Sequence, residues 1–183
     1  MLAWGMLTST RLTDTESAIF KESWQLYESA FPHEERRALA DHASAMAYEP
    51  RFVCLHLRDA QGFVGILFYW VFSQCVYVEH LAIAPARRGQ GLGKAALKLL
   101  QQHELPIILE IEPVTDAATA RRLRFYEDAG FHRLAAVHYQ LPYHRGEPPL
   151  RLELLSYPQA AGVALVASFE ADFLTLPMRY RAC

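Results

Sequence analysis

The sequence predicts a mixed α/β fold, and two observations carry this prediction. Residues Val76–Ile83 are mostly β-branched, aromatic or apolar, as expected of a largely buried strand. Just beyond Pro85, residues 87–94 read Arg-Arg-Gly-Gln-Gly-Leu-Gly-Lys, and from Leu92 apolar residues recur at helical spacing. Strand-like and helical runs alternate in the same way along the rest of the chain.

The N-terminal half predicts two helices followed by three strands. The dipeptide Phe31-Pro32 separates the helices, and Ile19 and Trp24 are among the apolar positions of the first. The turn sequence Asp-Ala-Gln-Gly at 59–62 joins the first two strands. Pro85 ends the third strand, because proline has no N–H for a sheet hydrogen bond. The expected elements are helices at 17–30 and 33–46 and strands at 51–57, 63–72 and Val76–Ile83.

The C-terminal half predicts three helices and three strands. Thr115 or Asp116 is expected to cap the second of these helices, which ends at Gly130. Pro106 enters the first strand, and Pro158 precedes the last helix. The expected elements are a helix at 92–103, a strand at 105–111, a helix at 116–129, strands at 131–140 and 150–155, and a helix at 159–174.

The last helix has two interpretations. Val163, Val166, Phe169 and Phe173 recur at helical spacing, so one face is apolar. We favour the interpretation that this face packs on the sheet as additional core. The alternative is a surface for self-association, which would make the protein a homodimer.

The loop at 87–94 has the properties of a phosphate-binding site. The first N–H groups of a helix lack internal partners and carry partial positive charge. Glycines at 89, 91 and 93 let a ligand approach the backbone closely, and Arg87, Arg88 and Lys94 add full positive charges. A Walker loop is excluded, because Ala95 replaces its Ser/Thr, and the glycine spacing does not match the dinucleotide-binding fingerprint.

Residues 81–93, Leu-Ala-Ile-x-Pro-x-Arg-Arg-Gly-x-Gly-Leu-Gly, resemble the acyl-CoA-binding motif of the GNAT acyltransferase superfamily. Arg88, Gly91 and Gly93 occupy its core, Arg/Gln-x-x-Gly-x-Gly/Ala. Residues 124–131, Arg-Phe-Tyr-Glu-Asp-Ala-Gly-Phe, are similar to the family's late motif, a helix that carries a tyrosine and ends at Gly-Phe. The resemblance covers about 10–155, and Thr119 stands where many members have asparagine.

The resemblance implies a central mixed, mostly antiparallel sheet with a splayed parallel strand pair, flanked by helices. A C-terminal helical extension at about 157–183 would follow this core. The pantetheine arm of acetyl-CoA would lie in the splay, and its pyrophosphate on the glycine loop. The residues expected to bind the cofactor are Leu81, Ala82, Ile83, Arg87, Arg88, Gly89, Gln90, Gly91, Leu92, Gly93, Lys94 and Tyr126.

Acyl transfer from a thioester to an amine needs an acid for the departing thiolate and a base for the amine. Tyr126 is the candidate acid, since tyrosine with an ordinary pKa near 10 is protonated at neutral pH. The alternative is that its ring only packs on the helix face. Glu79 and Glu110 are candidate bases, and Glu79 and His80 are expected to face opposite sides of their strand.

Glu110 and Glu112 lie two apart on a strand, so they share a face and suggest an acidic, water-lined cleft. Such a cleft favours a cationic amine acceptor. Glu112, Tyr69 and Phe31 are the candidate substrate-binding residues, although aromatic strand residues are more often core. Glu112 could instead lie in solvent at the strand end.

The composition argues against nucleic-acid-binding, metal-binding and membrane-spanning classes of protein. A net charge of -2 gives no reason to expect a nucleic-acid partner. Three cysteines without metal-ligand spacing indicate reduced thiols and no metal site, and Cys54 and Cys75 are expected in the core. No segment reads as a signal peptide or membrane span, so the expected location is cytoplasmic.

Together these observations predict an acetyl-CoA-dependent N-acetyltransferase acting on a primary amine of a small molecule or peptide by direct attack in a ternary complex. The identity of the amine is not readable from the sequence. The alternative is a non-catalytic acyl-CoA-binding module that senses the cofactor or regulates a partner.

Overall fold

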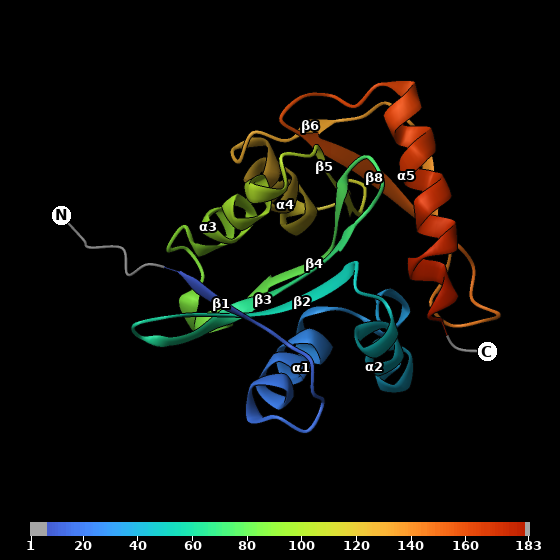
Figure 1. The fold of residues 1–183 in the computed structure, drawn as a ribbon. Helices are drawn as coiled ribbons and strands as arrows, with labels where there is room; N and C mark the ends of the chain where they lie inside the picture. Colours follow the sequence, from blue (N-terminus) through green and yellow to red (C-terminus); the bar gives the residue numbers. More distant parts are fainter. Residues whose placement is uncertain (1–6, 182–183) are drawn as a thin grey trace.

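The computed structural model describes residues 7–181 and is built around one twisted sheet (Figure 1). Its strand order is β1-β2-β3-β4-β5-β8-β6, and β7 pairs separately with β8. Every strand pair is antiparallel except β4 with β5, which is parallel. The strands are β1 Thr8–Arg11, β2 Phe52–Asp59, β3 Gly62–Val71, β4 Val76–Ile83, β5 Ile107–Ile111, β6 His132–Arg133, β7 His138–Gln140 and β8 Leu150–Tyr157.

Helices cover both faces of the sheet, and the sheet separates the core into two apolar layers. One layer contains Phe20 and Tyr27 of α1 together with Phe169 and Phe173 of α5. The other contains Leu97 of α3 and the aromatic end of α4. The helices are α1 Ala18–Ala30, α2 Leu39–Tyr48, α3 Leu92–Lys98, α4 Ala117–Glu127 and α5 Val163–Thr175.

The sequence predicts several elements close to their observed bounds. The strand predicted at Val76–Ile83 is confirmed over that range as β4. Asp116 caps α4, since its side chain accepts hydrogen bonds from the N–H groups of Ala118 and Thr119. Phe169 and Phe173 of α5 are buried, so the helix packs on the sheet as the favoured interpretation expects.

The helix predicted at 33–46 is wrong as a continuous element. A 3₁₀ turn at His33–Glu35 is followed by extended backbone at Arg36 and Ala38 before α2 begins. Arg37 lies in this break and is buried, with its N–H donating to the Tyr27 hydroxyl at 2.9 Å. Tertiary contacts of Arg37 therefore override the local helical pattern.

The strand predicted at 131–140 is also wrong as one element. Four residues separate Arg133 from His138, whereas two separate their partners Leu155 and Leu152 on β8. The surplus residues leave the sheet and divide the segment into β6 and β7. Similarly, the helix predicted at 92–103 changes after α3 into a 3₁₀ helix at Leu99–His103.

A β-bulge interrupts β4 at the centre of the sheet. Phe68 of β3 pairs with His80 and the next residue, Tyr69, pairs with Val78, so Glu79 is the extra residue. Alternation of side chains fails at a bulge. Glu79 and His80 consequently both contact the layer that α1 covers, and the expectation that they face opposite sides is wrong.

Both cysteines of the described chain are confirmed as buried and free, at positions 54 and 75. Cys183 lies outside the described residues. Within residues 7–181, no helix combines the length and apolar character needed to cross a bilayer.

Candidate active site

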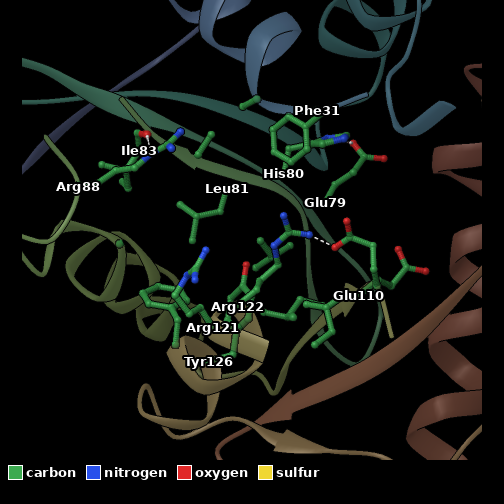
Figure 2. A pocket seen from close by; sticks show the side chains of 18 of the residues that line it. Phe31, Glu79, His80, Leu81, Ile83, Arg88, Glu110, Arg121, Arg122 and Tyr126 are labelled. Carbon is green, nitrogen blue, oxygen red and sulfur yellow. Dashed lines mark hydrogen bonds and ion pairs between the residues drawn. The ribbon is translucent and has the colours of Figure 1, made fainter. Parts of the chain in front are cut away.

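The parallel strands β4 and β5 separate after a short contact and open a cleft. They pair only from Val76 to Val78 on β4, against Ile107 to Leu109 on β5. Beyond this contact β4 continues to Ile83 without a partner on that side. The cleft has a volume of about 850 Å³, and the far ends of both strands line it together with α4 and the glycine loop (Figure 2).

The glycine loop forms one end of this cleft. Gly89 and Gly91 adopt positive φ angles of 76° and 74°, which side chains with a Cβ rarely tolerate. Gly91 is the N-cap of α3, so the first N–H groups of that helix lack internal partners at the cleft wall. The Arg88 guanidinium is anchored here, since its Nε donates to the Ile83 carbonyl at 3.0 Å.

Two of the predicted cationic residues are engaged by the protein itself. Arg87 donates to both carboxylate oxygens of Asp59, at 2.5 and 3.2 Å. The Lys94 ammonium donates to the Asp128 carbonyl at the end of α4, at 2.9 Å. Both residues line the cleft; Arg87 forms an ion pair with Asp59, whereas Lys94 bonds a neutral carbonyl.

Gly93 packs against the Phe125 ring of α4. A Cβ at this position would lie 2.9 Å from the Phe125 ring of α4. The third glycine of the motif therefore lets α3 and α4 approach each other at the cleft. Gln90 lies on the same loop, but it is not among the residues that line the cleft.

Tyr126 reaches the cleft from α4. Its ring packs edge-to-face against Phe125 and Phe131, and its side chain is largely buried. Burial raises the pKa of Tyr126 to about 12, so its hydroxyl is protonated at neutral pH. The residue thus has both a packing role and a proton donor at the cleft wall.

Glu79 lies at the junction of β4 and the cleft, in a buried ion pair with Arg37. Arg37 donates to its carboxylate at 2.5 Å, and Trp70 and Tyr143 donate at 3.1 and 2.8 Å. Burial opposes the ionisation of Glu79, but the charge of Arg37 outweighs it and lowers the pKa to about 2. A carboxylate so strongly stabilised as the anion is a poor proton acceptor.

Glu110 of β5 is the second predicted carboxylate in the cleft. The Tyr77 hydroxyl donates to its Oε2 at 2.5 Å, and the Gln140 amide donates to the same oxygen at 2.8 Å. His138 of β7 forms a very close contact with the other oxygen. These donors fix the orientation of the Glu110 carboxylate at the cleft wall.

The remaining predicted residues divide between cleft and core. Glu112 and Phe31 line the cleft, and Glu112 forms an ion pair with Arg122 of α4. Tyr69 does not line it: its ring is buried in the core layer that contains α3, and its hydroxyl contacts His103 at 3.2 Å. Its placement at the substrate-binding wall is therefore corrected.

Sequence reasoning missed several cleft residues. Arg121 and Arg122 lie on α4 and point into the cleft in Figure 2, and Glu35 comes from the turn before α2. Of these residues, only the two arginines could be predicted from their spacing, because they lie about one helical turn before Tyr126. Glu35 reaches the cleft only through the break in the predicted helix at 33–46. His80 also lines the cleft, and its Nε2 contacts the Glu35 carbonyl at 2.9 Å.

The chain is similar to proteins described as acetyltransferases. YjbC of Bacillus subtilis (strain 168), assigned as an acetyltransferase, is 34% identical over 112 residues, covering 60% of this chain and 56% of YjbC. A solved GNAT-family protein of Bacteroides thetaiotaomicron has a TM-score of 0.82 at 27% identity, covering 92% of this chain and 98% of that chain.

More distant solved structures share the fold. The ribosomal-protein-S18-alanine N-acetyltransferase of Escherichia coli has a TM-score of 0.58 at 20% identity, covering 86% of this chain and 96% of that chain. The model of the Acetyltransferase (GNAT) family matches residues 17–131, which include the glycine loop, the splayed strands and Tyr126. The chain therefore belongs to the GNAT acetyltransferase family.

Proposed function

We propose that this protein transfers an acetyl group from acetyl-CoA to a primary amine of a small molecule or peptide, by direct attack within a ternary complex. One observation carries the proposal. Tyr126 of α4 and Glu110 of β5 line the same cleft, and Glu110 directly follows the last residue of β5 that pairs with β4. An acid and a base thus line the place where an acyl donor and an amine could meet.

The chain's residues fit acetyl-CoA, which supplies the acyl group as an activated thioester. Leu81 and Ile83 offer backbone groups on the open side of β4 for the amides of the pantetheine arm, whereas the Ala82 carbonyl faces Gly65 of β3. Gly89, the N-cap Gly91 and the following N–H groups suit the pyrophosphate, and Arg88 adds charge there. Because Arg87 and Lys94 are bound to other partners, they support this loop mainly by holding it in place.

Tyr126 holds the proton that the departing thiolate requires. Its raised pKa keeps the hydroxyl protonated across the neutral range, and its packing fixes the ring. Glu110 is the better of the two candidate bases, because the permanently charged guanidinium of Arg37 holds Glu79 as the anion and lowers its pKa to about 2. Glu110 would accept the proton that the amine must lose, directly or through one water.

The acceptor end of the cleft favours a cationic amine. Glu35, Glu110 and Glu112 bring carboxylates from separate elements, and only Glu112 is paired with an arginine there. Phe31 supplies an apolar wall beside them. We also infer a cytoplasmic location, consistent with the two free thiols of the described chain.

The test measures release of free thiol from acetyl-CoA against a panel of primary amines. We expect amine-stimulated release that Glu110→Gln reduces about a hundredfold, near the usual value for losing a base. Glu127→Gln is the matched control, because this exposed residue adjoins Tyr126 without lining the cleft. Tight binding of acetyl-CoA with no amine-stimulated release would instead support the non-catalytic module.

The cofactor site is tested separately with Gly91→Val. A side chain at this positive-φ N-cap would distort the loop, so we expect acetyl-CoA affinity measured by calorimetry to fall at least about tenfold, or ~1.4 kcal/mol. Gly146→Val is the control, because Gly146 also has positive φ but lies away from the cleft. Equal affinities in the two variants would contradict the assignment of the loop.

A further inference from the structure

A histidine outside the family's matched region contacts the candidate base. The ring of His138 on β7 is only 4% exposed, and its Nε2 meets Oε1 of Glu110, which is equally buried. The other oxygen of Glu110 accepts from Tyr77 and Gln140. His138 thus closes one side of a carboxylate that is open only toward the cleft.

The opposite side of His138 faces the C-terminal helix α5. Its Nδ1 lies 3.9 Å from Oε1 of Glu170, whose side chain is 51% exposed. Phe169 and Phe173 of α5 pack against the imidazole ring at centroid distances of 5.8 and 6.3 Å. A carboxylate therefore lies at each ring nitrogen, and aromatic rings fix the ring plane.

This arrangement favours the protonated histidine. Burial disfavours the imidazolium, but the hydrogen bond and charge of Glu110 outweigh burial, and Glu170 adds to them, so the pKa of His138 is raised. Tyr77 faces the same cluster from β4 as a protonated phenol, since burial raises its pKa well above the ordinary value. Gln140 is neutral, so Glu110 and Glu170 are the charged groups that face the ring.

We propose that His138 is a positioning residue for acyl transfer: together with Glu170 it forms a carboxylate–histidine–carboxylate chain that orients Glu110 at the cleft and places a positive charge beside it. This inference rests on the proposed function. A charge-assisted hydrogen bond stabilises the carboxylate anion more than a neutral donor does. Since His138 and Glu170 both lie beyond residue 131, the C-terminal segment completes the site built by the family's matched region.

The first test measures the contact without turnover. In protein labelled at the histidine nitrogens, the NMR titration of His138 is followed in the wild type and in Glu110→Gln. Removing the carboxylate charge is expected to lower the titration midpoint of His138 by about one pH unit or more. Glu170→Gln should lower it by less, because Glu170 is farther away and half exposed. An unchanged midpoint in Glu110→Gln would overturn the proposal.

The second test is the pH dependence of kcat/KM in His138→Gln. Glutamine keeps an N–H donor but removes the positive charge beside Glu110. We expect the acid limb to move up by about one pH unit, with kcat/KM about tenfold lower on that limb. At higher pH the loss should be much smaller. Glu170→Gln, at a half-exposed position that tolerates substitution, should move the limb in the same direction by less.

His132→Gln is the matched control, because His132 is exposed on the neighbouring strand β6 and does not line the cleft. A uniform loss at all pH values in His138→Gln, with the acid limb unmoved, would show a merely structural role and overturn the proposal. The outcomes also separate the two proposals. Absence of any amine acetylation in the wild type would contradict the proposed function, whereas the NMR titration still tests the chain itself.

Discussion

At the scale of single residues, Tyr126 combines two roles that one substitution can separate. Its ring fills space between Phe125 and Phe131, and its hydroxyl holds a proton at the cleft. Tyr126→Phe keeps the ring, so the melting temperature and acetyl-CoA affinity should stay close to those of the wild type. Turnover should fall about a hundredfold, the usual order for losing a general acid.

The control for Tyr126→Phe is Tyr139→Phe, because Tyr139 is 56% exposed and does not line the cleft. Turnover is measured by thiol release at saturating amine and acetyl-CoA. If Tyr126→Phe retains full turnover, the hydroxyl has no catalytic part and the thiolate is protonated by solvent.

The sequence predicts the position of a residue well where its role follows from local chemistry. The positive φ angles at Gly89 and Gly91 are what a glycine-rich phosphate loop requires, and Tyr126 lies at the cleft. The bonding partners of Arg87 and Lys94 are not predictable from the local sequence. Their partners Asp59 and Asp128 lie 28 and 34 residues away in the chain, and no local pattern marks such pairs.

At the scale of elements, the Arg37–Glu79 pair joins three segments. Arg37 comes from the break before α2, Glu79 from the bulge of β4, and the carbonyls of Pro177 and Tyr180 accept from the guanidinium at 3.0 Å each. Both side chains are fully buried. The pair therefore anchors the C-terminal turn against the N-terminal helices.

Breaking this pair on one side should be costly. Arg37→Met leaves the Glu79 carboxylate buried without its counter-charge, so we expect about 3–5 kcal/mol less stability in urea unfolding. The double variant Arg37→Met with Glu79→Gln should recover much of the loss, because no buried charge remains. Arg51→Met, at a half-exposed ion pair with Glu49, should cost about 1 kcal/mol or less. A double variant as unstable as Arg37→Met would show that the charge is not the cause.

The same contacts explain which elements the sequence could predict. β4 was located because its apolar run and Pro85 are local signals. The bulge at Glu79 and the break at Arg37 carry no such signal, since both accompany an ion pair between residues that lie far apart in the chain. The division of 131–140 into β6 and β7 likewise depends on register with β8, which lies later in the chain.

At the scale of the whole molecule, the layer between the sheet and the N-terminal helices buries three histidines, and two of them contact Tyr27. His42 and His80 are 1% and 4% exposed, and both pack against Tyr27. Burial lowers the pKa of His42 to about 3 and that of His80 to about 4. Both are therefore neutral in the folded protein at pH 6, whereas in the unfolded chain they have ordinary pKa values near 6.5.

The sign of the resulting pH dependence follows from proton uptake. Below about pH 6.5 the unfolded chain binds protons at both positions and the folded protein does not, so stability falls as pH decreases toward 4. Each proton contributes about 1.4 kcal/mol per pH unit within this window. Glu79 extends the loss to lower pH, because its folded pKa of about 2 lies below its unfolded value. His138 acts in the opposite direction, since its folded pKa is raised.

We therefore expect the free energy of unfolding, measured in urea at pH 7, 6 and 5, to decrease steadily over this series. His42→Gln should reduce the slope by about one proton, or ~1.4 kcal/mol per pH unit, because glutamine does not titrate. His132→Gln, at an exposed position on β6, should leave the slope unchanged. A stability that does not vary between pH 7 and 5 in the wild type would mean that His42 and His80 bind protons in the folded protein. The aromatic layer around Tyr27 would then be more open to water than its burial indicates.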